Sequence, residues 1–296
     1  MKEEKLMKLG VITDEVTQDF KEALEFAREY GLDCVELRSV WEKGPFDYEM
    51  DDVLKIKALS DEYNIPVVAI SSPFFKCEYS EENIRVHNEK FARLVSFAKI
   101  LGAKQIRCFD FFKNPDVTRE MIIKAYEKAY ALCEEAGITI LIESEPSTNT
   151  RSCKDAAELV RKMNKPFFKV LYDPGNNVYA NDELPYPDGF NEIKSLFSHI
   201  HIKDAIKDRT SPEGAIGVAV GEGEVDYRGL FSELVKMGYS GCVMLETHYR
   251  QSGAKKLSGA TLLNPKGSAI SEGGYAASSE CIVNLKNIIK NATANN

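Results

Sequence analysis

The chain has 296 residues, of which 44% are hydrophobic and 28% charged, and this is ordinary for a globular protein with a large apolar core. Its formal net charge of −8, without a block of lysines or arginines, argues against a general role in binding nucleic acid or an anionic membrane surface. The absence of a long apolar run, of a signal-peptide pattern and of any C-x-x-C pair among the seven cysteines predicts a cytoplasmic protein.

Short β-rich runs recur along the whole chain, and segments with helical periodicity separate them. Between the first two runs, apolar residues from Phe20 to Ala27 have the i, i+3, i+4, i+7 spacing of an amphipathic helix. Gly31 and Gly102 each follow such a segment, at the position where a glycine commonly ends a helix. The predicted strands are 9–13, 34–38, 67–72, 105–109, 139–144, 169–174, 198–204 and 241–247.

Eight strands that alternate with helices predict parallel pairing, with each helix forming a right-handed crossover. Because no linker interrupts the series, we expect a single α/β domain over residues 1–296, folded as a (β/α)8 TIM barrel. The alternative is an open doubly wound sheet, which usually has fewer strands and often a glycine-rich first turn. The first turn here, TDEVTQD at 13–19, contains no glycine.

Two long loops are expected, at 205–224 after the seventh strand and at 248–274 after the eighth. Loops of this length inside a domain are usually functional or disordered. Both would emerge at the C-terminal end of the barrel, where active sites of this fold lie.

The last four strands each present a polar side chain near their C-terminal ends, where burial without a partner would be costly. A set of three carboxylates and one imidazole at the mouth of a barrel suits Mn²⁺, Mg²⁺, Co²⁺ or Zn²⁺. His199 shares a strand face with one of these residues and is expected to pack beside the site or support it. The predicted set is Glu143, Asp173, His201 and Glu246.

The segment 198–248 is the most distinctive part of the sequence. It contains HIHIKD (199–204), then VGEGEVD (220–226), a helical run, GYSG (238–241) and a strand with Glu246 at its end. This order resembles the sugar phosphate isomerase/epimerase family with the xylose isomerase-like TIM barrel. The IE of the fifth strand and DPGN (173–176) fit the same family.

The resemblance implies that Glu143, Asp173, His201 and Glu246 hold one divalent metal ion. It also implies that Glu143 and Glu246 act as the acid/base pair of a sugar or sugar phosphate isomerase or epimerase. Such an enzyme transfers a proton through a metal-stabilised enediolate. A hydride shift normally uses a second metal, for which the sequence shows no clear ligands. Relatives of this kind are often homodimers or homotetramers.

Four further residues are candidates for contacts with the small-molecule substrate. Asn176 stands where many family members carry a substrate-contacting histidine, and His248 directly follows the strand-eight pair Glu246–Thr247. Arg107 and Lys203 either bind substrate oxygens or form structural salt bridges. Arg250, Lys255, Lys256 and Lys266 in the last loop either clamp a phosphate or belong to a solvated, mobile or subunit-contacting loop.

Three alternatives to an isomerase are compatible with the same fold. An apurinic endonuclease clusters three zinc ions and needs many histidines, whereas this chain has four histidines and is acidic. A keto-inositol dehydratase would use a similar single-metal site, and this possibility stays open. A sugar-binding barrel with a degenerate site should lack at least one ligand, whereas all four are present.

Overall fold

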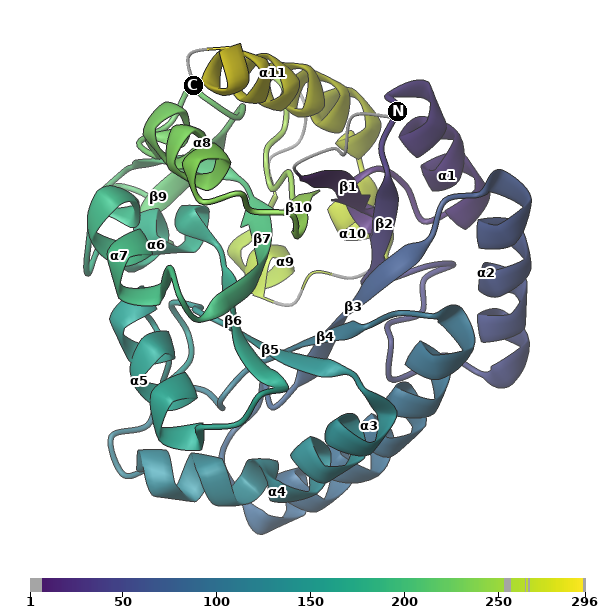
Figure 1. The fold of residues 1–296 in the computed structure, drawn as a ribbon, viewed down its shortest axis with the longest axis vertical. Coiled ribbons are helices and arrows are strands. Elements are labelled where there is room, and N and C mark those ends of the chain that lie inside the picture. The colour runs from purple at the N-terminus through teal and green to yellow at the C-terminus, as the bar shows by residue number, and fades with distance from the viewer. Residues whose placement is uncertain (1–6, 253–256, 264, 266, 295–296) are drawn as a thin grey trace.

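The computed structural model describes residues 7–252, 257–263, 265 and 267–294. Eight parallel strands close into a barrel in the order β1-β10-β7-β6-β5-β4-β3-β2 (Figure 1). This confirms the predicted (β/α)8 fold. The barrel strands are β1 (Lys8–Ile12), β2 (Cys34–Leu37), β3 (Val67–Phe74), β4 (Gln105–Cys108), β5 (Thr139–Glu143), β6 (Phe168–Tyr172), β7 (Phe197–Ile202) and β10 (Cys242–Leu245).

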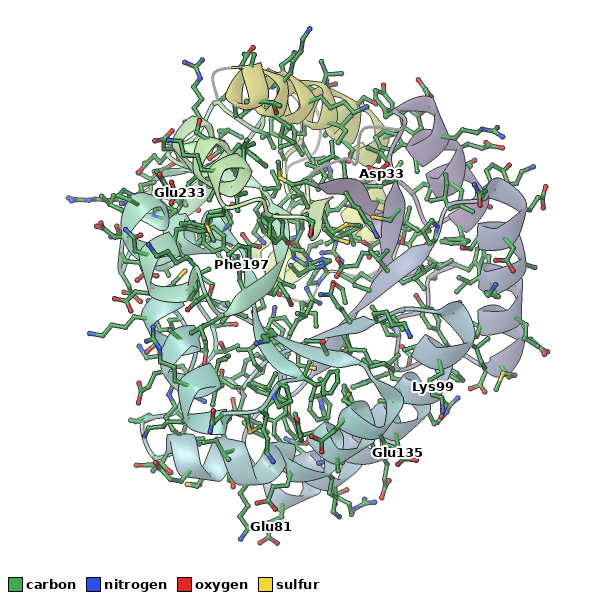
Figure 2. All side chains as sticks on the ribbon, viewed as in Figure 1. Asp33, Glu81, Lys99, Glu135, Phe197 and Glu233 are labelled. Atoms are coloured by element: carbon green, nitrogen blue, oxygen red, sulfur yellow. The ribbon has the colours of Figure 1, made fainter. Side chains whose placement is uncertain are left out.

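Helices surround the barrel and turn their charged faces outward. Glu81, Lys99 and Glu135, for example, lie on the outside of the helical ring (Figure 2). None of the described helices is long and apolar enough to cross a membrane. The principal helices are α1 (Phe20–Glu29), α2 (Met50–Tyr63), α3 (Glu81–Leu101), α4 (Arg119–Ala136), α5 (Cys153–Met163), α6 (Pro174–Ala180), α7 (Phe190–Ile193), α8 (Tyr227–Lys236) and α11 (Gly274–Ala294).

Local sequence signals set the ends of these helices. The Asp19 side chain accepts hydrogen bonds from the backbone N–H groups of Lys21 and Glu22 and so begins α1. Helices α3 and α4 end at Gly102 and Gly137, whose φ angles of 79° and 64° lie in the left-handed region that glycine adopts without strain. The glycine signals read from the sequence therefore mark real helix ends.

The interior of the barrel becomes more polar along β2 towards its C-terminal end. Cys34 belongs to a small apolar cluster with Ile12 and Met244. Two residues further on, Glu36 is fully buried, and Arg38, just past the strand, is almost so. Because alternate residues of a strand share a face, the polar positions of β2 lead directly to the mouth of the barrel.

The insertion after β7 is more ordered than a loop. It contains an antiparallel hairpin of β8 (Asp204–Lys207) and β9 (Ala215–Val218), in which Asp204 pairs with Val218. The β-branched Ile216 and Val218 suit such a strand. The segment 205–224 is therefore not a loop over its whole length, contrary to the expectation from the sequence. The turn of the hairpin brings Pro212 and Glu213 to the cavity described below.

The insertion after β10 contains two short helices, α9 (Gly259–Leu263) and α10 (Ser268–Ser271). Arg250 is buried, and its guanidinium donates to the backbone carbonyls of Tyr249, Ile270 and Glu272. It therefore belongs to the scaffold, and neither a phosphate clamp nor a solvated loop describes it. The other three cations predicted for this loop, Lys255, Lys256 and Lys266, lie outside the described residues.

Candidate metal centre and active site

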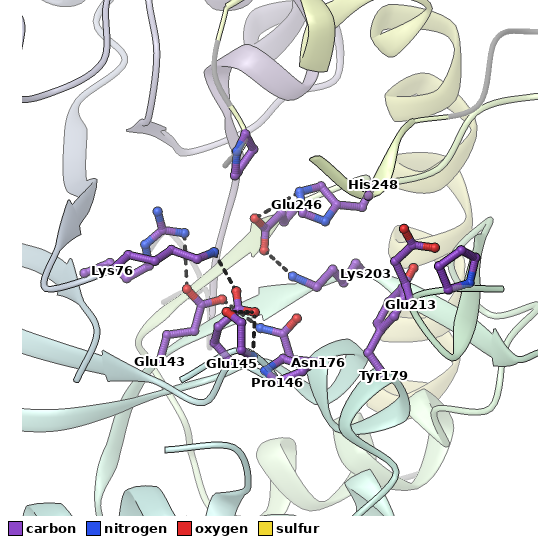
Figure 3. Close-up of a pocket in the computed structure, with 15 residues that line it drawn as sticks. Lys76, Glu143, Glu145, Pro146, Asn176, Tyr179, Lys203, Glu213, Glu246 and His248 are labelled. Atoms are coloured by element: carbon purple, nitrogen blue, oxygen red, sulfur yellow. Dashed lines mark hydrogen bonds and ion pairs between the residues drawn. The ribbon is translucent and has the colours of Figure 1, made fainter. Parts of the chain in front are cut away.

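Four buried side chains meet at the C-terminal end of the barrel. They are the predicted Glu143, Asp173, His201 and Glu246, and each offers a ligand-type atom within 4.8 Å of the others. Their strands β5, β6, β7 and β10 are neighbours in the barrel. Glu143 and Glu246 line a cavity of about 320 Å³, into which their carboxylates point (Figure 3).

The carboxylate ligand candidates lie at or directly after the C-terminal ends of their strands. Glu143 is the last residue of β5, while Glu246 follows β10, where its backbone N–H donates to the Ile202 carbonyl at 2.9 Å. Asp173 lies between β6 and α6, and its Oδ1 accepts the Asn176 backbone N–H at 3.0 Å. Since this capping bond uses one oxygen, Oδ2 remains for the cluster.

The DPGN motif requires glycine at position 175 for a steric reason. A Cβ atom at Gly175 would lie 2.4 Å from Lys203 Cγ and 2.6 Å from the Lys203 carbonyl oxygen. Only glycine lets α6 begin so close to β7. This close approach brings the end of β6, and with it Asp173, against β7.

The four side chains fit a divalent cation by a criterion independent of their spacing. Three of them bury an atom that makes no hydrogen bond of normal geometry to any described residue, namely Glu143 Oε2, Asp173 Oδ2 and His201 Nδ1. Leaving a buried polar group unsatisfied costs about 1–3 kcal/mol, so such atoms are rare in native structures. Carboxylate oxygens and an imidazole nitrogen are suitable ligands for Mg²⁺, Mn²⁺, Co²⁺ or Zn²⁺.

Two cations of the protein lie against the cluster. Lys203 Nζ is 2.6 Å from Asp173 Oδ2 and 2.7 Å from Glu246 Oε2, and Arg107 NH1 is 3.2 Å from Glu143 Oε2. The contacts to Asp173 and Glu143 are close ion pairs without hydrogen-bond geometry, whereas Lys203 also donates a hydrogen bond to Glu246. These cations lower the cost of burying three carboxylates together.

The three carboxyl groups differ in protonation. Burial raises the pKa of Glu143, but Arg107 and His201 outweigh burial and hold this pKa at about 2. For Glu246, burial is outweighed by Lys203 and His248, and the pKa lies well below its usual range. Burial raises the pKa of Asp173 to about 7, and Glu246 and Glu143 add to this while Lys203 opposes it. Glu143 and Glu246 are therefore ionised at neutral pH, as proton acceptors must be.

Glu36 on β2 orients His201. Both Glu36 carboxylate oxygens lie 3.2 Å from His201 Nε2, while Nδ1 lies 3.2 Å from Glu246 Oε2 and 3.7 Å from Glu143 Oε1. Burial lowers the pKa of His201, but Glu36 outweighs it and the pKa lies well above its ordinary value. A histidine that binds a metal commonly donates its other ring N–H to a carboxylate. Glu36 thus directs Nδ1 at the cluster.

His199 contacts Glu36 from the side of the barrel interior and so helps to hold it, in agreement with its predicted place beside the site. Its Nε2 lies 2.7 Å from Glu36 Oε2, and its Nδ1 lies 2.7 Å from Gln105 Oε1. Glu36 was not identified from the sequence. A single charged residue inside the apolar strand CVEL is nevertheless a signal of the same kind as those used for the other strands.

Arg38 was also missed, and it organises a second acidic group next to the first. Glu15, Glu246 and His248 have ligand-type atoms close together. Arg38 NH1 lies 2.6 Å from Glu246 Oε1, and Arg38 NH2 contacts Glu15 and lies 3.0 Å from Asp14 Oδ1. The guanidinium therefore brings a positive charge to this group and holds Oε1 of Glu246 in place.

The four predicted substrate-binding residues, Asn176, Arg107, Lys203 and His248, all line the cavity (Figure 3). Asn176 Nδ2 donates to Glu143 Oε1 at 3.1 Å and to the Ser144 carbonyl at 2.9 Å. His248 Nε2 lies 3.4 Å from Glu246 Oε1. All four therefore contact the proposed metal ligands, and their contacts with a substrate stay predictions.

A family model described as a xylose isomerase-like TIM barrel matches residues 24–273. The chain belongs to this family. The structure of D-allulose 3-epimerase from Methylomonas sp. in complex with D-allulose is similar to this xylose isomerase-like barrel, with a TM-score of 0.73, 15% identity, and coverage of 96% of each chain. The structure of the IOLI protein with a bound zinc atom has a TM-score of 0.72 and 17% identity, over 97% of this chain and 99% of that one.

Two curated relatives of this xylose isomerase-like barrel are inosose dehydratases. The protein from Geobacillus kaustophilus is 20% identical over 145 residues, which is 43% of this chain and only 44% of the relative. The protein from Geobacillus thermodenitrificans is 21% identical over 227 residues, which is 67% of this chain and 74% of the relative. Epimerases and dehydratases are thus both among the proteins that this chain resembles.

Proposed function

We propose that this protein is a divalent-metal-dependent sugar isomerase or epimerase in which Glu143 and Glu246 exchange a proton with the substrate. The observation that carries the proposal is the cluster of four buried side chains with three unsatisfied ligand atoms at the mouth of the barrel. The likeness to an epimerase structure with a bound sugar supports it. Glu143, Asp173, His201 and Glu246 would hold the metal.

The metal, when bound, would polarise a substrate carbonyl and make the adjacent C–H more acidic. Glu143 and Glu246 stand on β5 and β10, at the two ends of the arc of four strands that carries the cluster. Carboxylates so placed can approach a planar substrate carbon from different sides, so one removes a proton as the base while the other, once it has taken up a proton from solvent, donates that proton as the acid. Both line the cavity, and the ionised form that each has at neutral pH is the one that a base requires.

Neighbouring side chains set the strength of the two bases. Asn176 and Arg107 contact Glu143, whereas Arg38 and Lys203 contact Glu246. The hydrogen bonds from Asn176, Arg38 and Lys203 fix the carboxylate planes, and the Arg107 ion pair helps to keep Glu143 ionised. The hydroxyl groups of a sugar could then pair with Lys203 and His248, which line the same cavity.

The decisive experiment measures deuterium incorporation from D₂O into a panel of ketoses. The protein is stripped of metal and reloaded separately with Mn²⁺, Co²⁺, Mg²⁺ and Zn²⁺. We expect at least one ketose to gain deuterium next to its carbonyl with one metal equivalent bound. Replacing Glu246 with Gln should reduce this exchange by at least about 100-fold, because general-base contributions are typically of that size.

Glu135→Gln makes the same chemical change on the outside of α4 and serves as the matched control (Figure 2). Its exchange rate should equal that of the wild type. Failure to bind any divalent ion would contradict the ligand assignment. Metal binding without exchange in any ketose would contradict the isomerase and epimerase chemistry alone.

A second candidate is a dehydratase acting on a keto-inositol, and the two inosose dehydratase relatives favour it. This reaction begins with the same proton removal but ends with loss of a hydroxyl as water. Incubation of the metal-loaded protein with an inosose distinguishes the two functions. A product lighter by one water in the mass spectrum indicates the dehydratase, whereas an isomer of unchanged mass indicates the epimerase.

A further inference from the structure

A second cavity of about 430 Å³ adjoins the first, and Lys76, Arg107 and Pro265 line both. The two cavities differ in charge. Four glutamates line the first, whereas Asp47 is the only acidic residue among the described residues that line the second. The cationic residues of the second cavity are Arg38, Lys76, Lys90 and Arg107.

Three of these four cations are already paired with carboxylates. Arg38 pairs with Glu15 and Glu246, Lys76 Nζ lies 2.7 Å from Glu145 Oε2, and Arg107 NH1 pairs with Glu143. The groups left to recognise an anion in the second cavity are Lys90, the neutral His87 and the remaining donors of Arg107.

Arg107 has an unused donor. The side chain is 5% exposed, NH1 pairs with Glu143, and NH2 lies 3.5 Å from the Ser72 carbonyl. Its Nε–H group is buried and has no hydrogen-bond partner among the described residues. Because Nε is enclosed by protein atoms, it reaches an acceptor in the cavity that Arg107 lines only when the guanidinium turns, and the cost of about 1–3 kcal/mol for a buried donor without an acceptor favours that turn.

His87 supplies a second donor whose tautomer can be deduced. The Phe75 backbone N–H donates to His87 Nδ1 at 2.9 Å, and a backbone N–H can only donate. Nδ1 is therefore the unprotonated nitrogen, and the ring proton lies on Nε2. Burial, with the nearby Lys90, lowers the pKa of His87 to about 4, so the ring is neutral at pH 7 and keeps this arrangement.

Lys90 supplies the charge. It lies on α3 one turn from His87, and its ammonium is 5.5 Å from the centre of the Phe46 ring, which also lines the cavity. Unlike Arg38 and Lys76, it forms no ion pair with another described residue. An exposed ammonium at the rim can turn towards an anion below it.

We propose that the second cavity is an oxyanion subsite, in which Lys90, His87 and Arg107 bind a carboxylate or phosphate at the non-reacting end of the substrate. This inference rests on the proposed function, because it places the reacting carbonyl among the glutamates of the first cavity. The preferred substrates would then be keto sugar acids or keto sugar phosphates. Neutral ketoses would fill only the first cavity.

The test compares matched substrates in the deuterium-exchange assay with the metal-loaded protein. D-fructose is neutral, D-fructose 6-phosphate carries a phosphate and D-fructuronate carries a carboxylate. We expect kcat/KM to be at least about tenfold higher for one of the anionic substrates, because charge-assisted hydrogen bonds have strengths of this order. The better of the two shows which oxyanion is bound.

The variant Lys90→Met should lower the ratio of anionic to neutral kcat/KM about tenfold, through the KM for the anionic substrate. Lys99→Met changes the same residue type near the end of the same helix, outside the cavity, and should leave the ratio unchanged (Figure 2). Equal rates for all three substrates, or a ratio insensitive to Lys90→Met, would overturn the subsite while leaving the proposed function intact.

If no ketose exchanges, the proposed function fails, and the subsite is then decided by direct binding. Inorganic phosphate is titrated into the protein and followed by calorimetry. Saturable binding that Lys90→Met weakens and Lys99→Met does not would support the oxyanion subsite. Absence of saturable binding, or binding equal in both variants, would overturn it.

Discussion

Glu36 links the barrel interior to the proposed metal centre without being a ligand itself. Replacing this carboxylate with an amide keeps the size of the side chain but removes the negative charge and one of the two oxygens that face His201 and His199. We predict that Glu36→Gln lowers the affinity for Mn²⁺ or Zn²⁺ about 10- to 100-fold, because a carboxylate partner raises the basicity of a ligating histidine. Isothermal titration calorimetry measures this change directly.

The control for this prediction is Glu36→Asp, which keeps the charge and should recover part of the affinity. Urea unfolding of the metal-free variants separates an effect on folding from one on the site. Affinity unchanged in Glu36→Gln would show that His201 does not depend on this carboxylate for its orientation.

The site could be predicted to the extent that its residues stand at strand ends. Glu143, Asp173 and Glu246 each end an apolar run, and the topology of a barrel then places such residues together. Glu36 and Arg38 escaped prediction because they lie on β2 and just after it, and β2 is not adjacent to any of the strands that carry the cluster. Contacts between side chains of strands that are not neighbours depend on the lengths and directions of those side chains, and no local sequence pattern indicates these.

At the scale of elements, the strands and helices followed their local patterns, whereas the insertions did not. The hairpin depends on the antiparallel pairing of β8 with β9 and on packing of β9 against the backbone of His248. A Cβ atom at Gly217, for example, would lie 2.4 Å from the His248 carbonyl oxygen. Contacts of this kind are tertiary. The sequence of 205–224 therefore indicated the length and the position of the insertion, but not that it folds as a hairpin.

Gly175 provides a test of how tightly α6 is held. We predict that Gly175→Ala destabilises the fold by about 1–3 kcal/mol, the usual cost of overpacking, because the new methyl group meets backbone atoms of Lys203. Since α6 is capped by Asp173, metal affinity should fall as well. Urea denaturation and calorimetry measure the two effects.

Gly44→Ala is the matched control, because a Cβ atom there would lie no closer than 3.6 Å to Asp47 Oδ2. Its unfolding midpoint and metal affinity should equal those of the wild type. Wild-type stability in Gly175→Ala would mean that α6 and β7 can separate without cost.

For the molecule as a whole, metal binding should be coupled to pH. Burial raises the pKa of Asp173 to about 7, and the Glu36 carboxylate, opposed by burial, raises the pKa of His201 well above its ordinary value. Both groups must lose a proton to bind a metal, so affinity should rise with pH. We expect about two protons to be released per metal near pH 6 and about one near pH 8, where Asp173 is already ionised.

Calorimetry in buffers of different ionisation enthalpy counts these protons. A proton release that stays the same from pH 6 to pH 8 would contradict the raised pKa of Asp173. No release at either pH would contradict the assignment of His201 as a ligand.

The order of the strands divides the barrel into two halves with different tasks. The arc β10-β7-β6-β5 carries the groups that would perform the chemistry, while Arg107 on β4, Arg38 after β2, and α3 after β3 border the oxyanion subsite. Arg38 and Arg107 also contact Glu246 and Glu143, whereas His87 and Lys90 on α3 belong to no described hydrogen bond or ion pair with the proposed metal ligands. Mutations on this face of α3 should therefore alter which molecules are accepted without disturbing how they react. Such a separation makes the scaffold readily evolvable: a library confined to α3 should yield new specificities from one conserved reaction.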